Sequence, residues 1–122
     1  MSDQKTILVV EDESEYRSIL KQKLEAEGFA VKLAGDGIEA LKILDGDHVG
    51  LILLDLLMPK MNGVNFIYSL NTSAHKDVPI IILTNLSQSP ETEVSQPTIK
   101  DFLVKASTPL EEVVEKVKEY SS

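Results

Sequence analysis

Short continuous runs of apolar residues recur along the chain and are separated by amphipathic stretches. Runs of this kind, bounded by polar residues, are typical of strands that are covered on both faces of a sheet. Three runs are clear and two are weaker; they are Ile7–Val10, Leu51–Leu54 and Val78–Leu83, and then Phe29–Leu33 and Phe102–Val104. The pattern therefore predicts five buried strands.

The stretches between the runs place apolar side chains at helical spacing. Start and stop signals agree with helices there: Gly28 stands where a helix commonly ends, and Asp36 begins a capping-box-like sequence. A third helix begins at Gly63, and the last has Thr108 as its N-cap and Pro109 as its first helical residue. The spaced residues are Tyr16, Ile19, Leu20 and Leu24; Ile38, Leu41 and Leu44, on one face; Val64, Ile67 and Tyr68; and Leu110, Val113, Val114 and Val117.

Residues 85–100 should supply a fourth helix, but they contain Pro90, Pro97 and few apolar side chains. Proline suits the first turn of a helix and ends one further on, so we expect a short or irregular helix here. Strands that alternate with helices predict a doubly wound, flavodoxin-like α/β fold with a five-stranded parallel sheet. We expect residues 1–122 to form a single domain without an output domain.

Charge and composition remove several classes of function. The chain has 20 acidic and 12 basic residues, so its net charge is −8. Such a domain is a poor partner for nucleic acid, whose phosphates dominate binding, and for an anionic membrane surface. It contains no cysteine, which excludes disulfides and thiolate metal sites and fits a reducing compartment. We therefore expect a cytoplasmic protein with neither nucleic acid nor membrane as a partner.

Charged and hydroxyl side chains stand at the ends of four predicted strands. Glu11 and Asp12 follow the first run, Asp55 follows the third, Thr84 ends the fourth and Lys105 follows the fifth. In a doubly wound sheet, ligands bind beyond the carboxyl ends of the strands. With strand order 2-1-3-4-5, Asp12 and Asp55 converge, and Thr84 and Lys105 flank them.

Carboxylates that converge in this way repel one another unless a cation joins them. Carboxylate oxygens, waters and a phosphate oxygen are the usual ligands of Mg²⁺ in proteins. Lys105 adds a fixed positive charge, and Thr84 adds a hydroxyl donor. Together these groups can hold a phosphoryl group on Asp55, because the metal and the lysine neutralise the transferring oxygens while the carboxylate attacks in line.

The same residues carry a resemblance that covers essentially the whole chain. The segments ILVVEDE, LILLDLLMPKMNG, IIILTN and DFLVK resemble, in order and spacing, a response regulator receiver domain of two-component signalling. The chain is similar to the stand-alone chemotaxis regulators of that family. The resemblance implies that Asp55 is the phosphoacceptor. It also implies that Asp12 binds Mg²⁺ directly, Glu11 mostly through water, and Leu57 through its backbone carbonyl.

The resemblance further implies a phosphorelay role. Thr84 would shift towards the phosphoryl group, Lys105 would pair with it, and Phe102 would be an aromatic switch residue that turns inward. A histidine kinase, a phosphotransfer protein or a small phosphodonor such as acetyl phosphate would supply the group. The surface of the fourth helix, fifth strand and fifth helix would then change for an unknown downstream protein. The chain would be a monomer or a weak phosphorylation-dependent dimer, and not a conventional enzyme.

Two positions beside the expected site depart from the family pattern. Ala106 follows Lys105, where the family usually has proline after a cis bond, so we expect either a trans bond with a rearranged loop or a strained bond. Asn85 follows Thr84, where a small residue is usual. Its larger amide would narrow access to the phosphoryl group or hydrogen-bond to it, which predicts slower phosphotransfer or hydrolysis than in an Asn85→Ala variant.

Other functions fit the sequence less well. Haloacid-dehalogenase-type phosphatases need a second acid two residues after the aspartate, where this chain has Leu57. A flavin mononucleotide module needs a hydroxyl- and glycine-rich loop after the first strand, where the acids of this chain repel phosphate. The main alternative is a receiver-like module that signals by binding alone, without phosphorylation.

Overall fold

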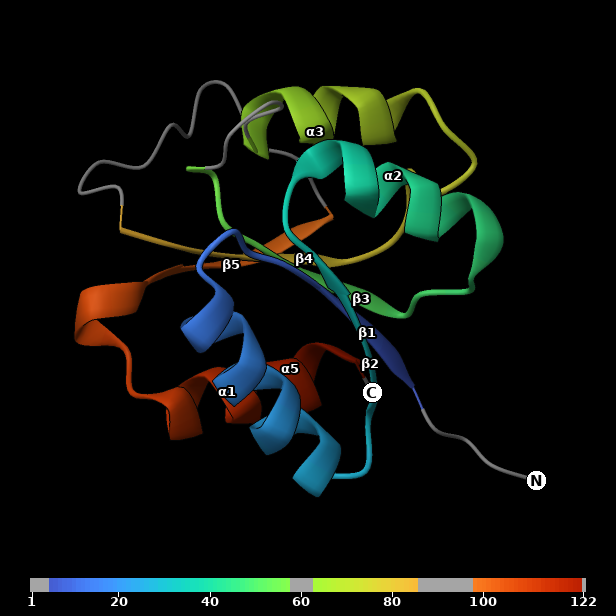
Figure 1. The fold of residues 1–122 in the computed structure, drawn as a ribbon. Helices are drawn as coiled ribbons and strands as arrows, with labels where there is room; N and C mark the ends of the chain where they lie inside the picture. The colour runs from blue at the N-terminus through green and yellow to red at the C-terminus, as the bar shows by residue number, and fades with distance from the viewer. Residues whose placement is uncertain (1–4, 58–62, 86–97, 122) are drawn as a thin grey trace.

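The computed structural model describes residues 5–57, 63–85 and 98–121 of the 122-residue chain. Five parallel strands form one sheet in the order β2-β1-β3-β4-β5, which confirms the predicted topology (Figure 1). The strands are β1 (Thr6–Val10), β2 (Ala30–Ala34), β3 (Leu51–Leu54), β4 (Ile80–Thr84) and β5 (Ile99–Val104). The helices among the described residues are α1 (Ser14–Ala26), α2 (Gly37–Gly46), α3 (Gly63–Asn71) and α5 (Leu110–Ser121), with a 3-10 turn at Lys105–Ser107.

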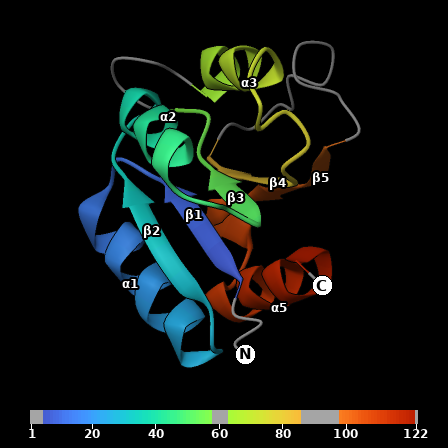
Figure 2. The same cartoon turned by 90° about the vertical axis from the view of Figure 1, so that its right-hand side faces the viewer.

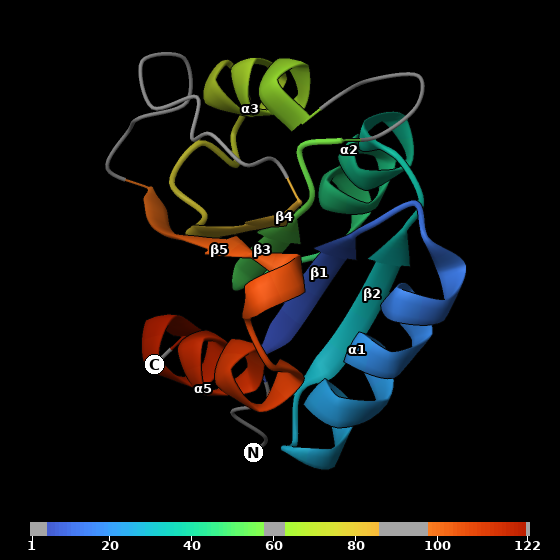
Figure 3. The same ribbon diagram turned by 90° about the vertical axis from the view of Figure 1, so that its left-hand side faces the viewer.

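Helices cover both faces of the sheet. Figure 1 shows α2 and α3 on one face and α1 and α5 on the other, and Figures 2 and 3 show the same two layers from the sides. Alternate residues of β1 divide between the layers: Leu8 and Val10 face the cluster with α2 and α3, and Ile7 and Val9 face the cluster with α1 and α5. Burial on both faces explains why the central strands are continuous apolar runs.

The register of the central strands aligns their carboxyl ends. Val10 of β1 is opposite Leu54 of β3, and the N–H of Asp55 donates to the carbonyl of Val10 (3.0 Å). At the far side of the sheet, Thr84 of β4 is opposite Val104 of β5. The residues that directly follow β1, β3 and β5 therefore meet at one edge of the sheet.

The predicted helix signals are present with small differences. Gly28 ends α1 with φ of 96°, a left-handed conformation that glycine adopts without strain. The Asp36 carboxylate accepts from the N–H of Glu39 (2.8 Å) at the start of α2. Helix α5 begins at Leu110, one residue later than expected, and the Pro109 carbonyl accepts from the N–H of Val113 (3.2 Å). The expected fourth helix falls on residues 86–97, which lie outside the described residues.

The prediction that Ile38 shares the packed face of α2 with Leu44 is wrong. Ile38 is 42% exposed, whereas Gly37, Ala40 and Leu44 are buried. The helix packs against the core through Ala40 and Leu44, with Leu41 and Ile43 partly buried beside them, and this orientation leaves Ile38 exposed to the solvent. None of the helices that the structure describes has the length and apolar character that a membrane span needs.

Phe66 and Tyr68 test the orientation of α3. Replacing the fully buried Phe66 with alanine should lower the free energy of unfolding by about 3–5 kcal/mol, because it leaves a cavity beneath α3. Tyr68→Ala is the matched control on the same helix; Tyr68 is 55% exposed, so its loss should stay below about 1 kcal/mol. Chemical denaturation followed by circular dichroism measures both. Equal losses would contradict the packing of α3.

Candidate functional site

Asp55 is a buried carboxylate that accepts hydrogen bonds at both oxygens. It lies one residue beyond β3 and is only 5% exposed. One oxygen, Oδ1, accepts from the Thr84 hydroxyl (2.7 Å) and from the N–H of Leu57 (2.9 Å). The other, Oδ2, accepts from Lys105 Nζ (2.9 Å). The charge that ends the apolar run of β3 is therefore compensated by donors from three segments of the chain.

Lys105 bridges two acids that come from different strands. Its ammonium forms ion pairs with Asp55 and with Glu11, which follows β1, and the Lys105 side chain is only 9% exposed. Burial alone would lower the pKa of the Lys105 ammonium, but the hydrogen bonds to Glu11 and Asp55 and their negative charges raise it above its ordinary value. The lysine is therefore a permanent cation in this site.

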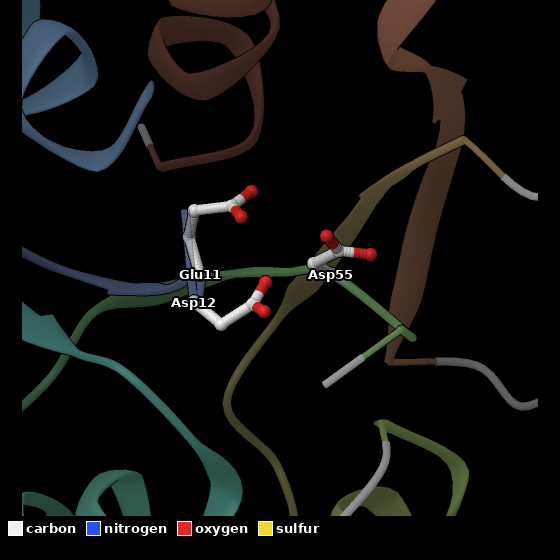
Figure 4. A group of neighbouring side chains, drawn as sticks. All are labelled: Glu11, Asp12 and Asp55. Atoms are coloured by element: carbon white, nitrogen blue, oxygen red, sulfur yellow. The ribbon is translucent and has the colours of Figure 1, made fainter. Parts of the chain in front are cut away.

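The site nevertheless carries more negative than positive charge. Burial raises the pKa of the Glu11 carboxyl and outweighs the hydrogen bonds from Lys105 and from the N–H of Glu13. Glu11, Asp12 and Asp55 each place one carboxylate oxygen within 4.8 Å of those of the other two (Figure 4). Three carboxylates thus face one ammonium, and like charges held this close favour the binding of a further cation.

The chemistry of these donors fits Mg²⁺. All three side chains offer hard oxygen ligands, which Mg²⁺ prefers, and Mg²⁺ commonly binds one or two carboxylates and keeps several waters. Glu11 and Asp55 are buried, whereas Asp12 is exposed and opens the cluster to solvent on one side. Water molecules and a phosphorylated donor therefore have a route to the same group of oxygens.

Sequence reasoning missed two residues of α1 that shape this site. The Tyr16 ring lies under the Lys105 ammonium, 4.7 Å from Nζ to the ring centroid, a favourable cation–π contact. Arg17 Nη1 donates to the carbonyl of Glu11 (2.6 Å) and fixes the backbone that presents the acids. Tyr16 was expected only as part of an amphipathic helix and Arg17 was not singled out, because nothing in the spacing shows which side chains turn towards the strand ends.

The remaining predicted residues differ in the contacts that they make. Leu57 contacts it through its N–H, and the expected metal contact of its carbonyl stays a prediction. Phe102 is partly buried on β5 and packs against the cluster that includes α2 and α3. The Asn85 amide oxygen accepts from the N–H of Ala106 (3.0 Å). No cis peptide bond occurs among the described residues, so Lys105–Ala106 is trans, which is one of the two geometries that we expected, and Lys105–Ser107 form a 3-10 turn.

Comparison with known proteins gives the same family across most of the chain. The family model described as a response regulator receiver domain matches residues 7–118. The chain is 41% identical over 106 residues to the probable transcriptional regulator ycf27 of Porphyridium aerugineum, covering 86% of this chain and 43% of that protein. It is 46% identical over 78 residues to the transcriptional regulatory protein CpxR of Escherichia coli (strain K12), covering 64% and 32%. The chain thus spans less than half the length of these relatives.

Solved structures agree in fold and in length. The response regulator TrrA of Thermotoga maritima, solved in complex with Mg²⁺ and BeF, is 35% identical, with a TM-score of 0.82 and coverage of 96% and 99% of the two chains. The receiver domain of the Francisella response regulator 1452 is 25% identical, with a TM-score of 0.86 and coverage of 97% of each chain. With the family model matching residues 7–118, these findings establish that the chain belongs to the response regulator receiver domain family.

Proposed function

We propose that Asp55 accepts a phosphoryl group in a Mg²⁺-dependent reaction and that this modification switches the domain between two signalling states. The observation that carries the proposal is the Asp55 carboxylate itself, which Thr84, Leu57 and Lys105 hold beside the oxygens of Glu11 and Asp12. The phosphoryl group comes from a histidine kinase, a phosphotransfer protein or a small phosphodonor. The complex of TrrA with Mg²⁺ and BeF supports this reading by analogy.

The reaction is a substitution at phosphorus. A carboxylate oxygen of Asp55 attacks in line and forms a new O–P bond, while the bond from phosphorus to the nitrogen or oxygen of the donor breaks and its electron pair leaves with the donor. Thr84 and Lys105 then transfer their hydrogen bonds from the carboxylate to the phosphoryl oxygens. Glu11, Asp12 and Asp55, with the carbonyl of Leu57, would hold Mg²⁺, which supplies positive charge against the charge of the transferring group.

The phosphoryl group acts on distant surfaces through a shift of populations. Movement of Thr84 towards the phosphoryl group empties space that Phe102 enters, and this alters the surface of the fourth helix, β5 and α5 for a downstream protein. The named relatives are transcriptional regulators more than twice as long as the matched segment. A partner or an attached region that controls transcription is therefore the downstream target that the relatives favour. A cytoplasmic location stays a prediction.

Asp55 should gain the mass of one phosphoryl group when the protein is incubated with Mg²⁺ and acetyl phosphate. Intact-mass spectrometry measures the gain, and NMR with the beryllofluoride mimic reports the change at Thr84 and Phe102. Asp55→Asn should gain nothing, whereas Asp47→Asn, which changes an exposed acid at the end of α2, should behave like the parent. A parent protein that gains no mass, and whose spectra match those of Asp55→Asn, would favour signalling by binding alone.

Mg²⁺ should stabilise the folded protein, because the acid cluster binds it only when β1 and β3 are aligned. At a Mg²⁺ concentration ten times the dissociation constant, the free energy of unfolding should rise by about 1.4 kcal/mol. Asp12→Asn should reduce this gain, and Asp47→Asn, an exposed acid at the end of α2, should leave it unchanged. Thermal unfolding with Mg²⁺ or with a chelator measures the effect, and an equal gain in Asp12→Asn would argue against this cluster.

Lys105→Met should destabilise the metal-free protein at pH 7 by about 1–3 kcal/mol, because Glu11 and Asp55 lose their shared cation at a partly open rim. The deficit should shrink as the pH falls through the raised pKa of the Glu11 carboxyl, which lies above the ordinary glutamate value of 4.5, since a protonated Glu11 needs no cation. At alkaline pH, the lysine's contribution is lost as the pH rises from 10.5 through its raised pKa.

The exposed Lys21–Glu25 pair provides the control for this variant. Lys21 Nζ lies 3.0 Å from Glu25, a distance similar to that between Lys105 and Asp55, but both side chains are more than 40% exposed. Lys21→Met should therefore change the free energy of unfolding by less than about 0.5 kcal/mol. Urea denaturation across the pH range measures both variants. A similar loss of unfolding free energy in the two variants would contradict the role of Lys105 in stabilising the buried carboxylates.

A further inference from the structure

Asn85 and Ala106 join the ends of two strands beside the site. The Asn85 amide oxygen accepts from the backbone N–H of Ala106 (3.0 Å), and both residues are exposed. Thr84 and Val104 form the last pair of the β4–β5 ladder, so this hydrogen bond continues the sheet beyond its final backbone pairing. The Asn85–Ala106 hydrogen bond thus ties the end of β4 to the turn that follows β5.

This hydrogen bond connects the residues that directly follow the two side-chain donors of Asp55. Thr84 donates to Oδ1 and is followed by Asn85; Lys105 donates to Oδ2 and is followed by Ala106. The contacts therefore form a closed ring from Asp55 through Thr84 and Asn85, across to Ala106 and Lys105, and back to Asp55. Displacement of the turn at Lys105–Ser107 would stretch the ring at the Asn85–Ala106 contact.

One member of the contact is the Asn85 side chain, and the other is a backbone N–H that any residue except proline supplies. Proline at position 106 would have no N–H to donate. Alanine, valine or serine at position 85 would lack the amide oxygen that reaches across to the neighbouring turn. The two departures from the family pattern therefore supply the donor and the acceptor of one hydrogen bond, and neither makes this contact without the other.

We propose that Asn85 is a positioning residue, which ties the turn after β5 to the end of β4 and thereby holds Lys105 between Glu11 and Asp55. The contact also couples movement of the turn to movement of Thr84, so the Thr84 hydroxyl and the Lys105 ammonium approach a phosphoryl group together. This second part rests on the proposed phosphorylation of Asp55, whereas the positioning of Lys105 does not. The size of the Asn85 side chain led us to expect faster phosphotransfer in Asn85→Ala than in the parent. The positioning role predicts the opposite, because loss of the amide should slow phosphotransfer.

The test uses the full chain, the variants Asn85→Ala and Ala106→Pro, and their combination. Asn85→Asp keeps an oxygen acceptor and Ala106→Ser keeps the N–H, so these two are the matched controls. The first readout is the NMR signal of the Lys105 ammonium without Mg²⁺ or phosphodonor, because hydrogen bonds to Glu11 and Asp55 slow its exchange with water. The second readout is the initial rate of phosphoryl transfer from acetyl phosphate in the presence of Mg²⁺. Thermal unfolding checks that every variant is folded.

Asn85→Ala and Ala106→Pro should each broaden or shift the Lys105 signal and slow the transfer about two- to tenfold, the range expected for one hydrogen bond. The combined variant should be no slower than either single one. Both matched controls should restore the signal, and Ala106→Ser, which adds no charge, should also restore most of the rate. A Lys105 signal and rate in Asn85→Ala equal to those of the parent would overturn the proposal. Additive losses in the combined variant would do the same.

The two readouts separate this inference from the proposed function. If the parent takes up no phosphoryl group but the Lys105 signal still depends on Asn85, the proposed function fails and the positioning of Lys105 stands. If the parent is phosphorylated and the variants match it in both readouts, the positioning role fails alone. Should Ala106→Pro not fold, the comparison of Asn85→Ala with Asn85→Asp gives the same decision through the first readout.

Discussion

One ammonium group shared by two buried carboxylates is the interaction on which this site depends. Lys105 pairs with Glu11 and with Asp55, which follow neighbouring strands. Without the lysine, two like charges would lie side by side in a partly dry environment, which is strongly unfavourable. The lysine itself reaches them only because β5 lies beside β4 at the edge of the sheet, and its side chain crosses the end of β4. The strand order therefore determines whether a cation reaches the two carboxylates and balances their charge.

The apolar strands make this arrangement rigid. Leu51–Leu54 is buried at every position, with alternate residues in the two core layers. A one-residue shift of β3 would move every one of these side chains into the opposite, already packed layer. Asp55 consequently leaves the sheet at a fixed height, level with the residues that follow β1. The hydrophobic core thus determines the spacing of the carboxylates, although none of its side chains takes part in the chemistry.

The sequence predicted the strand order and most of the charged residues of the site, because parallel strands bring their carboxyl ends to one edge. It could not predict contacts that depend on side-chain direction. Tyr16 was expected at helical spacing, yet its ring contacts the Lys105 ammonium. Ile38 was expected on one face with Leu41 and Leu44, yet it is exposed, because residue spacing alone does not determine how α2 is rotated against the sheet. Residues 86–97 lie outside the described part of the chain, so the irregular fourth helix stays a prediction.

Asn85 and Ala106 show why departures from a family pattern are better examined in pairs. Considered separately, the first adds bulk beside Thr84 and the second removes a proline after Lys105, and each argues for a weakened site. In the structure, the amide oxygen of Asn85 meets the N–H that alanine provides and proline lacks. The Lys105 ammonium still reaches both acids from a trans peptide and a 3-10 turn. A hydrogen bond between the two strand ends is thus a second way to hold a lysine in place, and it links that lysine to the hydroxyl of the adjacent strand.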